Sequence, residues 1–316
     1  MNALFDFATR HRALLAIAFL AVFPLVAPYH ALATNILLLG LYALGFNLLF
    51  GYTGLLSFGH AAFLGTGAYW CGMTIVHAGW PWWAGILAGI AMTIVSAAIV
   101  GFLAIRTRGI YFSMVTLALS QCLYYLYYKA ERWTGGENGL RGINVKTIDL
   151  PGVQLDFVDP LVKYYVILVF VAAAILLFSR ILASPFGAVL EAIRENENRA
   201  RACGFDVART KLVAFVLSGA FCGLAGALLA IHLSAVSTEL LYYLLSGEAV
   251  MMALLGGMGT FFGPFIGAGV FLVFQDVVST WTKHWMLYVG AVFMLFVLFF
   301  PRGIWGSILH WLRGGR

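Results

Sequence analysis

Long apolar runs separated by short polar connections extend along almost the whole 316-residue chain. A helix needs about 20 apolar residues to cross the hydrocarbon core of a bilayer, and lipid-exposed loops do not occur within that core. The runs therefore predict an all-α polytopic membrane protein, a single domain over residues 1–316 built as a bundle of about eight to ten transmembrane helices. The expected spans are 13–30, 34–51, 55–76, 83–105, 110–130, 161–181, 211–232, 240–257, 264–281 and 285–300.

The number of spans stays open because glycine-rich stretches after Gly51 and Gly256 are compatible with broken or re-entrant helices. The first apolar run also has two interpretations. Arg10 and Arg12 precede it, and the small residues Ala-Leu-Ala follow at 31–33, as in a cleaved signal peptide. Retention as the first span is favoured, because the rest of the chain is itself membrane-embedded and needs no separate export signal.

Two long polar connections interrupt the pattern, at 131–160 and 182–210, and residues 184–211 hold nine of the 32 charged side chains. Ser184 and Pro185 suit the N-cap and the first position of a helix. Apolar residues then recur at the i, i+3, i+4 and i+7 spacing of one helix face. These residues are Phe186, Val189, Leu190 and Ile193. We therefore predict a short amphipathic helix whose apolar face is covered by a groove in a partner or by the membrane surface.

The same stretch is expected to contain a second short helix. Asn196 and Asn198 are poor residues for a helix interior, so they are expected to separate the first helix from another near 199–203, which Gly204 ends. Residues 184–211 carry five basic and four acidic side chains. This balance favours a protein groove over an anionic membrane surface, which attracts segments rich in Lys and Arg.

Composition agrees with a membrane protein, since 62% of the residues are hydrophobic, 10% are charged and the mean hydropathy is +0.94. In such a chain the formal net charge of +6 indicates orientation, and no nucleic-acid partner is expected. Placing both termini, 106–109 and 180–211 on one side puts 13 of the 19 Lys and Arg residues there. The positive-inside rule makes this side cytoplasmic and makes 131–160 an extracytoplasmic loop.

Catalytic chemistry is not indicated. The sequence contains no zinc-protease, hydrolase-elbow or phosphate-binding motif, and its four cysteines lie singly, without metal-ligand spacing. The segment 54–60, GLLSFGH, comes nearest to a hydrolase elbow. Its spacing disfavours an intramembrane hydrolase, which stays an alternative. We expect neither a metal nor a cofactor bound by this chain.

Few ionisable residues lie within the expected spans, whereas a carrier driven by protons or sodium ions is expected to have more. For His60 a hydrogen bond between helices is favoured over a substrate contact, and for Glu248 a structural bond and a pathway-lining role are equally supported. Irregular, glycine-rich backbone at membrane depth needs protein or a cavity around it. The residues expected on a substrate pathway are Gly51, Gly54, Ser57, His60, Tyr111, Thr116 and Glu248. Other glycines recur at helical spacing, as at Gly219, Gly223 and Gly226, and for these close helix packing is favoured over a ligand role.

Several long motifs carry a family resemblance. They are NLLFGYTGLLSFGHAAFLGTGAY at 47–69, RTRGIYFSMVTLALSQ at 106–121, TGGENGLRGI at 134–143, SPFGAVLEAIRENENRARACGFDVARTKLVAFVLSGAFCGLAGAL at 184–228 and LLGGMGTFFGPFIGA at 254–268. From about Asn35 to Ile304 the chain resembles the permease subunits of bacterial branched-chain amino acid ABC importers, of the type that pairs with a second homologous permease.

The resemblance implies that 182–210 is a cytoplasmic coupling loop that docks on an ATP-binding subunit. The general importer signature E-A-A-x-x-x-G is replaced here by Asn198, Arg199 and Ala200, with Gly204 at its last position. The residues implied in coupling are Phe186, Leu190, Ile193, Arg194, Glu195, Asn196, Arg199, Ala200 and Gly204.

The implied partners are a second permease, two ATP-binding subunits, a periplasmic substrate-binding protein and membrane lipid. ATP is bound by the partner subunits, and this chain does no chemistry. The implied location is the bacterial inner membrane, with both termini cytoplasmic. Branched-chain or related small amino acids are the expected cargo. Urea, short amides or another small molecule are alternatives, as is an ATP-independent channel or secondary carrier.

Overall fold

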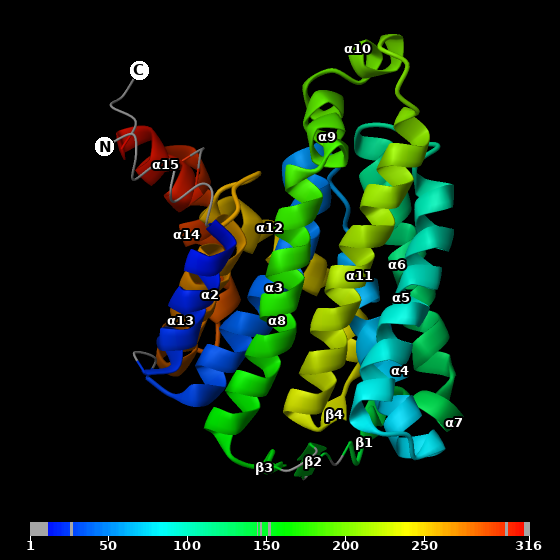
Figure 1. Ribbon diagram of the computed structural model, residues 1–316, viewed down its shortest axis with the longest axis vertical. Coiled ribbons are helices and arrows are strands. Elements are labelled where there is room, and N and C mark those ends of the chain that lie inside the picture. Colours follow the sequence, from blue (N-terminus) through cyan, green and yellow to red (C-terminus); the bar gives the residue numbers. More distant parts are fainter. Residues whose placement is uncertain are drawn as a thin grey trace.

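The computed structural model describes residues 12–25, 28–143, 145, 147–150, 153–300 and 303–312, which form a bundle of long helices (Figure 1). The helices are α2 (Arg12–Val22), α3 (His30–Thr53), α4 (His60–Ala78), α5 (Trp82–Ala104), α6 (Ile110–Lys129), α7 (Glu131–Thr134), α8 (Pro160–Ala183), α9 (Pro185–Glu195), α10 (Glu197–Ala202), α11 (Val207–Leu233), α12 (Tyr243–Gly256), α13 (Gly263–Trp281), α14 (Trp285–Phe299) and α15 (Gly303–Leu312). Short 3₁₀ turns are η1 (Phe23–Leu25), η2 (Gly136–Asn138) and η3 (Thr238–Leu241).

Seven helices in the described part of the chain are long and apolar enough to cross a bilayer. They are α3, α5, α6, α8, α11, α13 and a run that begins with α14, and α12 is a shorter apolar helix. This confirms the predicted fold class, an all-α polytopic membrane protein. Most boundaries agree closely with the sequence; for example, α5 and α13 begin one residue before the predicted starts at 83 and 264.

The predicted span 55–76 begins too early. Gly54 ends α3 in the left-handed conformation, with φ of 74°, and α4 begins only at His60. An irregular linker, 54–59, therefore connects the two helices. The residues of this linker are largely apolar, so hydropathy alone could not separate them from the helix that follows.

The centre of the bundle is α11, which packs against α3, α4 and α5. Small residues allow this packing, because a Cβ built on Gly226 would overlap the carbonyl oxygen of Leu64 and lie 3.1 Å from the amide nitrogen of Ala68. A Cβ built on Gly67 of α4 would likewise overlap the backbone carbonyl oxygen of Gly223 on α11. The helix-packing role favoured for Gly223 and Gly226 is confirmed.

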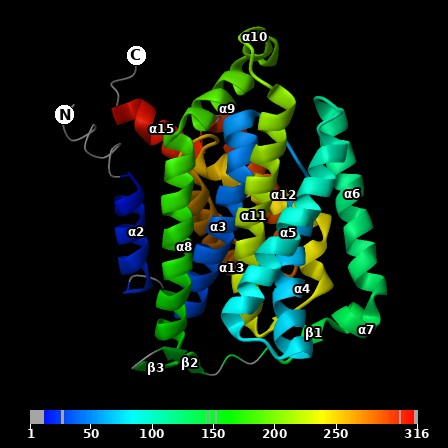
Figure 2. The same cartoon turned by 45° about the vertical axis from the view of Figure 1, so that its right-hand side comes forward.

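The two long polar connections lie at opposite ends of the bundle (Figures 1 and 2). α9 and α10 form a projection at the end where α2 begins and α15 lies. The other connection contributes strand β1 (Leu140–Arg141) and a hairpin of β2 (Thr147–Leu150) and β3 (Val153–Asp156). β1 pairs with β4 (Ala235–Val236), which follows α11. These short strands were not expected from the sequence.

Candidate coupling site

The projection consists of two short helices, as the sequence predicted. Pro185 occupies the first turn of α9, with Ser184 at its N-cap position, although the Ser184 hydroxyl donates to the Ile181 carbonyl at 2.6 Å. Asn196 breaks the helix in an extended conformation, and its side-chain oxygen accepts from the Arg199 amide at 3.0 Å as the N-cap of α10. Gly204 follows with φ of 90°. These turn residues therefore determine where α9 and α10 begin and end.

The apolar face of α9 is covered by this chain itself. Leu190 is fully buried and belongs to the main hydrophobic core, against which Phe186 also packs. Ile193 packs with Ala200 of α10 and Val207 of α11 in a smaller cluster. The prediction that a partner or the membrane surface covers this face is therefore wrong, because periodicity shows that a face is covered but does not show by what.

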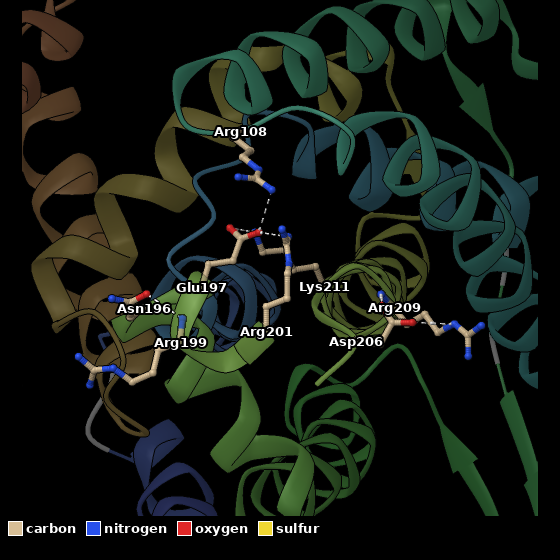
Figure 3. Close-up of polar contacts among 8 residues, drawn as sticks. All are labelled: Arg108, Asn196, Glu197, Arg199, Arg201, Asp206, Arg209 and Lys211. Carbon is tan, nitrogen blue, oxygen red and sulfur yellow. Dashed lines mark hydrogen bonds and ion pairs between the residues drawn. The ribbon is translucent and has the colours of Figure 1, made fainter. Parts of the chain in front are cut away.

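An ion-pair cluster around Glu197 ties the projection to the spans (Figure 3). The Glu197 carboxylate accepts from Lys211 Nζ at 2.7 Å and from Arg201 Nη2 at 3.1 Å, and Arg108 Nη2 lies 3.7 Å away. Arg108 comes from the turn between α5 and α6, and Lys211 from the first turns of α11. The Lys211 side chain is only 10% exposed, so loss of this carboxylate would leave a largely buried ammonium group without its ion-pair partner. One acidic residue thus holds three elements together.

The cationic neighbours also set the ionisation of Glu197. Partial burial alone would raise its pKa, but the hydrogen bond and charge of Lys211, with the charges of Arg108 and Arg201, lower the pKa below its ordinary value. Because the folded-state pKa is lowered, stabilisation by this carboxylate is complete above the ordinary value of 4.5 and is lost as the pH falls through the folded-state value.

Glu197→Gln is therefore expected to destabilise the protein at pH 7 by about 1–2 kcal/mol, below the cost of breaking a fully buried pair because Glu197 is partly exposed. Thermal unfolding of the purified protein measures this loss. Asp206→Asn is the matched control, since it keeps an N-cap acceptor and removes only the exposed pair with Arg209. Equal melting temperatures for wild type and Glu197→Gln at pH 7, or a difference that disappears already at pH 6, would contradict this role.

The outer surface of the projection presents the other predicted coupling residues to solvent. Glu195, Asn196, Arg199 and Gly204 are exposed. Sequence reasoning missed Phe205, which is 45% exposed directly after Gly204. An exposed aromatic side chain in an otherwise charged turn is a typical anchor of a protein interface. Its only signal in the sequence is a lone aromatic residue between polar ones.

Arg194 is exposed as well, but unlike these residues it has a guanidinium that contacts the end of a membrane-spanning helix. Its Nη1 donates to the carbonyl of Gly51 at the end of α3. Gly54 lies beside the same side chain, since a Cβ built there would be 3.4 Å from Arg194 Cγ. The structure therefore brings together two residues that the sequence assigned to different roles, one to coupling and the other to the pathway.

Ser57 and Thr116 are brought together at the linker 54–59. The hydroxyl of Thr116 on α6 accepts from the Phe58 amide at 3.2 Å, and the hydroxyl of Ser57 accepts from the Gly59 amide at 3.2 Å. Ser113, one turn before Thr116, donates to the Leu56 carbonyl at 2.6 Å. These hydroxyls satisfy backbone groups that the irregular linker leaves unpaired. α6 and the linker thus form one hydrogen-bonded unit.

His60, the first residue after the linker, is fully buried. Its Nε2 is 2.8 Å from the Ser218 hydroxyl on α11, and that hydroxyl donates to the Gly45 carbonyl at 2.6 Å. Because Ser218 has one proton, Nε2 must be the donor to it. The helix-to-helix hydrogen bond expected for His60 is confirmed.

The remaining pathway candidates lie on other surfaces. Tyr111 is 70% exposed at the start of α6. Glu248 is half-buried on α12, two residues after Ser246, whose hydroxyl accepts from the Ala61 amide at 2.9 Å. This bond fixes α12 against the first turn of α4, but side chains two residues apart on a helix do not share a face, so the bond does not place Glu248 there.

Comparison with known proteins adds independent information. Residues 29–300 match the sequence family described as the permease component of the branched-chain amino acid transport system. The high-affinity branched-chain amino acid transport system permease protein LivM of Salmonella typhimurium is 30% identical over 296 residues, covering 86% of this chain and 69% of that protein. LivM of Escherichia coli is 28% identical over 292 residues, with the same coverage.

A more distant relative is archaeal. The probable branched-chain amino acid transport permease protein LivM of Methanocaldococcus jannaschii is 24% identical over 242 residues, covering 68% of each chain. No solved structure matched this chain significantly.

Proposed function

The chain belongs to the branched-chain amino acid transport permease family, and on this premise we propose that α9 and α10 couple it to ATP-binding partner subunits during amino acid import. The observation that carries the proposal is the projection itself, an ordered, charge-rich pair of helices held at one end of an apolar bundle. A solvated surface loop would need neither the buried face of α9 nor the ion-pair cluster at Glu197. Both features hold the projection rigidly against the bundle, so that movement of a docked partner can be transmitted to the membrane-spanning helices.

The docking surface consists of the exposed side of the α9–α10 turn and of the turn that follows α10. Its residues are Glu195, Asn196, Arg199, Gly204 and Phe205. Phe205 supplies the apolar anchor, and the charges around it set register and partner choice. Phe186, Leu190, Ile193 and Ala200 act from within, because they seat the projection on the bundle.

The substrate pathway of this chain includes the 54–59 linker and α6. Irregular backbone at membrane depth is tolerated where protein or water surrounds it, and the linker hydroxyl contacts meet that condition. α6 is the least apolar of the seven candidate spans, although most of it is unburied in this chain. A helix that faces lipid is expected to be more apolar. The unburied face of α6 therefore suits contact with a second permease, or with a substrate pathway between this chain and that permease. Glu248 contributes from α12.

Branched-chain amino acids are the proposed cargo, because the relatives carry this specificity in their names. A second permease, two ATP-binding subunits and a periplasmic binding protein complete the proposed importer. ATP would be bound by the partner subunits, and this chain would hold no cofactor and catalyse no reaction. The chain is a multi-pass membrane protein. Its proposed location is the bacterial inner membrane.

Purification of the tagged chain in mild detergent tests the proposal. ATP-binding subunits encoded with it should copurify in a stable complex, and substrate-loaded binding protein should stimulate ATP hydrolysis by that complex. A chain that purifies alone and still mediates amino acid flux would support the alternative of an ATP-independent channel or carrier.

The proposed orientation has both termini and the projection in the cytoplasm. Asn198 in α10 and Asn138, between α7 and β1, are exposed and serve as reporter positions. These elements lie at opposite ends of the bundle (Figure 1). Cys122 and Cys203 are exposed native thiols, so the experiment uses a background in which both are alanine. Cysteine introduced at Asn138 should react with an impermeant thiol reagent added to intact cells, whereas cysteine at Asn198 should react only after permeabilisation. The reverse pattern would invert the orientation.

A further inference from the structure

The guanidinium of Arg194 satisfies a helix end. Gly51 lies in the last turn of α3, where carbonyls lack intrahelical donors and carry the negative end of the helix dipole. The carbonyls of Leu49 and Phe50 accept from the amides of Leu55 and Gly54. Arg194 Nη1 donates to the next carbonyl, that of Gly51. A residue of the projection therefore completes the end of a membrane-spanning helix.

The same guanidinium contacts the loop 257–262, which joins α12 to α13. A Cβ built on Gly259 would lie 2.7 Å from Arg194 Nη1 and 2.9 Å from the Gly51 carbonyl oxygen, so the three groups meet without spare room. Gly259 also has φ of 69°, which other residues rarely adopt. The loop is thus shaped to let Arg194 and the end of α3 approach it.

Asn47 fixes the loop to α3 from within the bundle. Its side chain is fully buried; the amide oxygen accepts from the Gly259 amide at 3.0 Å, and the amide nitrogen donates to the Thr260 carbonyl at 3.0 Å. We call Asn47, Gly51, Arg194, Gly259 and Thr260 the Arg194 junction. Within the described residues no carboxylate lies within ion-pair distance of Arg194, so its charge serves the carbonyl end of α3.

We propose that Arg194 is a positioning residue that transmits movement of α9 to the ends of α3, α12 and α13. This inference rests on the proposed coupling function of the projection. The planar guanidinium restricts sliding between α9 and the end of α3. A displacement of α10 by a docked ATP-binding subunit therefore moves the linker 54–59, which follows α3, and α12, which carries Glu248. Arg194 acts between the docking surface and the pathway, and it contributes to transmission and not to docking.

The test measures binding and coupling separately in the purified transport complex reconstituted in lipid nanodiscs. For Arg194→Ala we expect the ATP-binding subunits to remain in the complex and basal ATP hydrolysis to stay within about twofold of wild type. Stimulation by substrate-loaded binding protein should fall about tenfold, a typical size for coupling between two sites. Arg194→Lys keeps the charge but not the planar fork, so it should restore stimulation in part. Arg209→Ala, which removes an exposed arginine paired with Asp206, is the matched control and should remain coupled.

The outcomes separate this inference from the proposed function. If the unmodified complex carries no ATP-binding subunits, the proposed function fails and this inference fails with it. If the wild-type complex assembles and Arg194→Ala is fully stimulated, only the transmission role is wrong. Loss of the ATP-binding subunits from both Arg194 variants would assign Arg194 to docking and would also overturn the inference.

Discussion

Gly226→Ala is expected to be the most destabilising single methyl addition in the bundle centre. The new Cβ would overlap the carbonyl oxygen of Leu64 and lie 2.8 Å from its carbonyl carbon. Both are main-chain atoms of α4, so no side-chain rotation can relieve the overlap and α4 must move away from α11. Overpacking costs typically about 1–3 kcal/mol, and a contact with backbone places this site at or above about 3 kcal/mol.

Thermal unfolding in detergent, followed by size-exclusion chromatography, measures the loss. Gly290→Ala is the matched control, because no atom of the described residues lies within 4 Å of a Cβ built at that mid-helix glycine of α14. Alanine is the better helix former by about 1 kcal/mol, so this control should be neutral or slightly stabilising. If Gly226→Ala melts at the same temperature as Gly290→Ala, the close contact between α4 and α11 is wrong.

Combined change of Arg199 to Glu and Phe205 to Ala is expected to release the ATP-binding subunits. Phe205 is the exposed aromatic anchor of the docking surface, and truncating such an anchor costs about 2 kcal/mol or more. Under the proposal, the partner surface is complementary to the exposed positive charge of Arg199, so reversing that charge adds electrostatic repulsion between the two surfaces. A total of about 3 kcal/mol weakens association more than a hundredfold, since about 1.4 kcal/mol corresponds to a factor of ten.

Quantification of ATP-binding subunits that copurify with the tagged chain gives the readout, and uptake by cells should fall in parallel. Arg132→Glu makes the same charge reversal on an exposed residue of α7, the helix at the opposite end of the bundle (Figure 1), and it should leave the complex intact. If the double variant still copurifies with stoichiometric ATP-binding subunits, Arg199 and Phe205 are not docking residues. Arg201 is unsuited to this experiment, because it pairs with Glu197 within the chain.

Hydropathy and turn chemistry predict most of the architecture, because both are local. The apolar runs located α5 and α13 to within one residue at their starts, and Ser184, Pro185 and Asn196 marked the limits of α9 and α10. The start of α4 was missed since linker residues such as Leu55 and Phe58 are as apolar as a span. Their irregular backbone is stabilised by α6 hydroxyls, and that contact joins positions 58 residues apart.

The site depended on contacts that no local pattern contains. Glu197 meets Arg108 although α6, α7, α8, α9 and a long loop separate them in the sequence, and Arg194 meets Gly51 at a separation of 143 residues. The sequence correctly placed an apolar face on α9, but only the packing shows that this chain covers it. Phe205 became a candidate through its exposure, which depends on the fold of the turn after α10.

Transport by the purified importer in sealed liposomes tests the central claim most directly. The liposomes contain this chain, its partner permease and the ATP-binding subunits, with ATP on the side of α9 and α10 and loaded binding protein on the side of β2 and β3. Leucine should accumulate against its gradient at a rate proportional to ATP hydrolysis and should not accumulate with a non-hydrolysable ATP analogue. Leucine flux that proceeds at the same rate without ATP hydrolysis would contradict an ATP-driven permease.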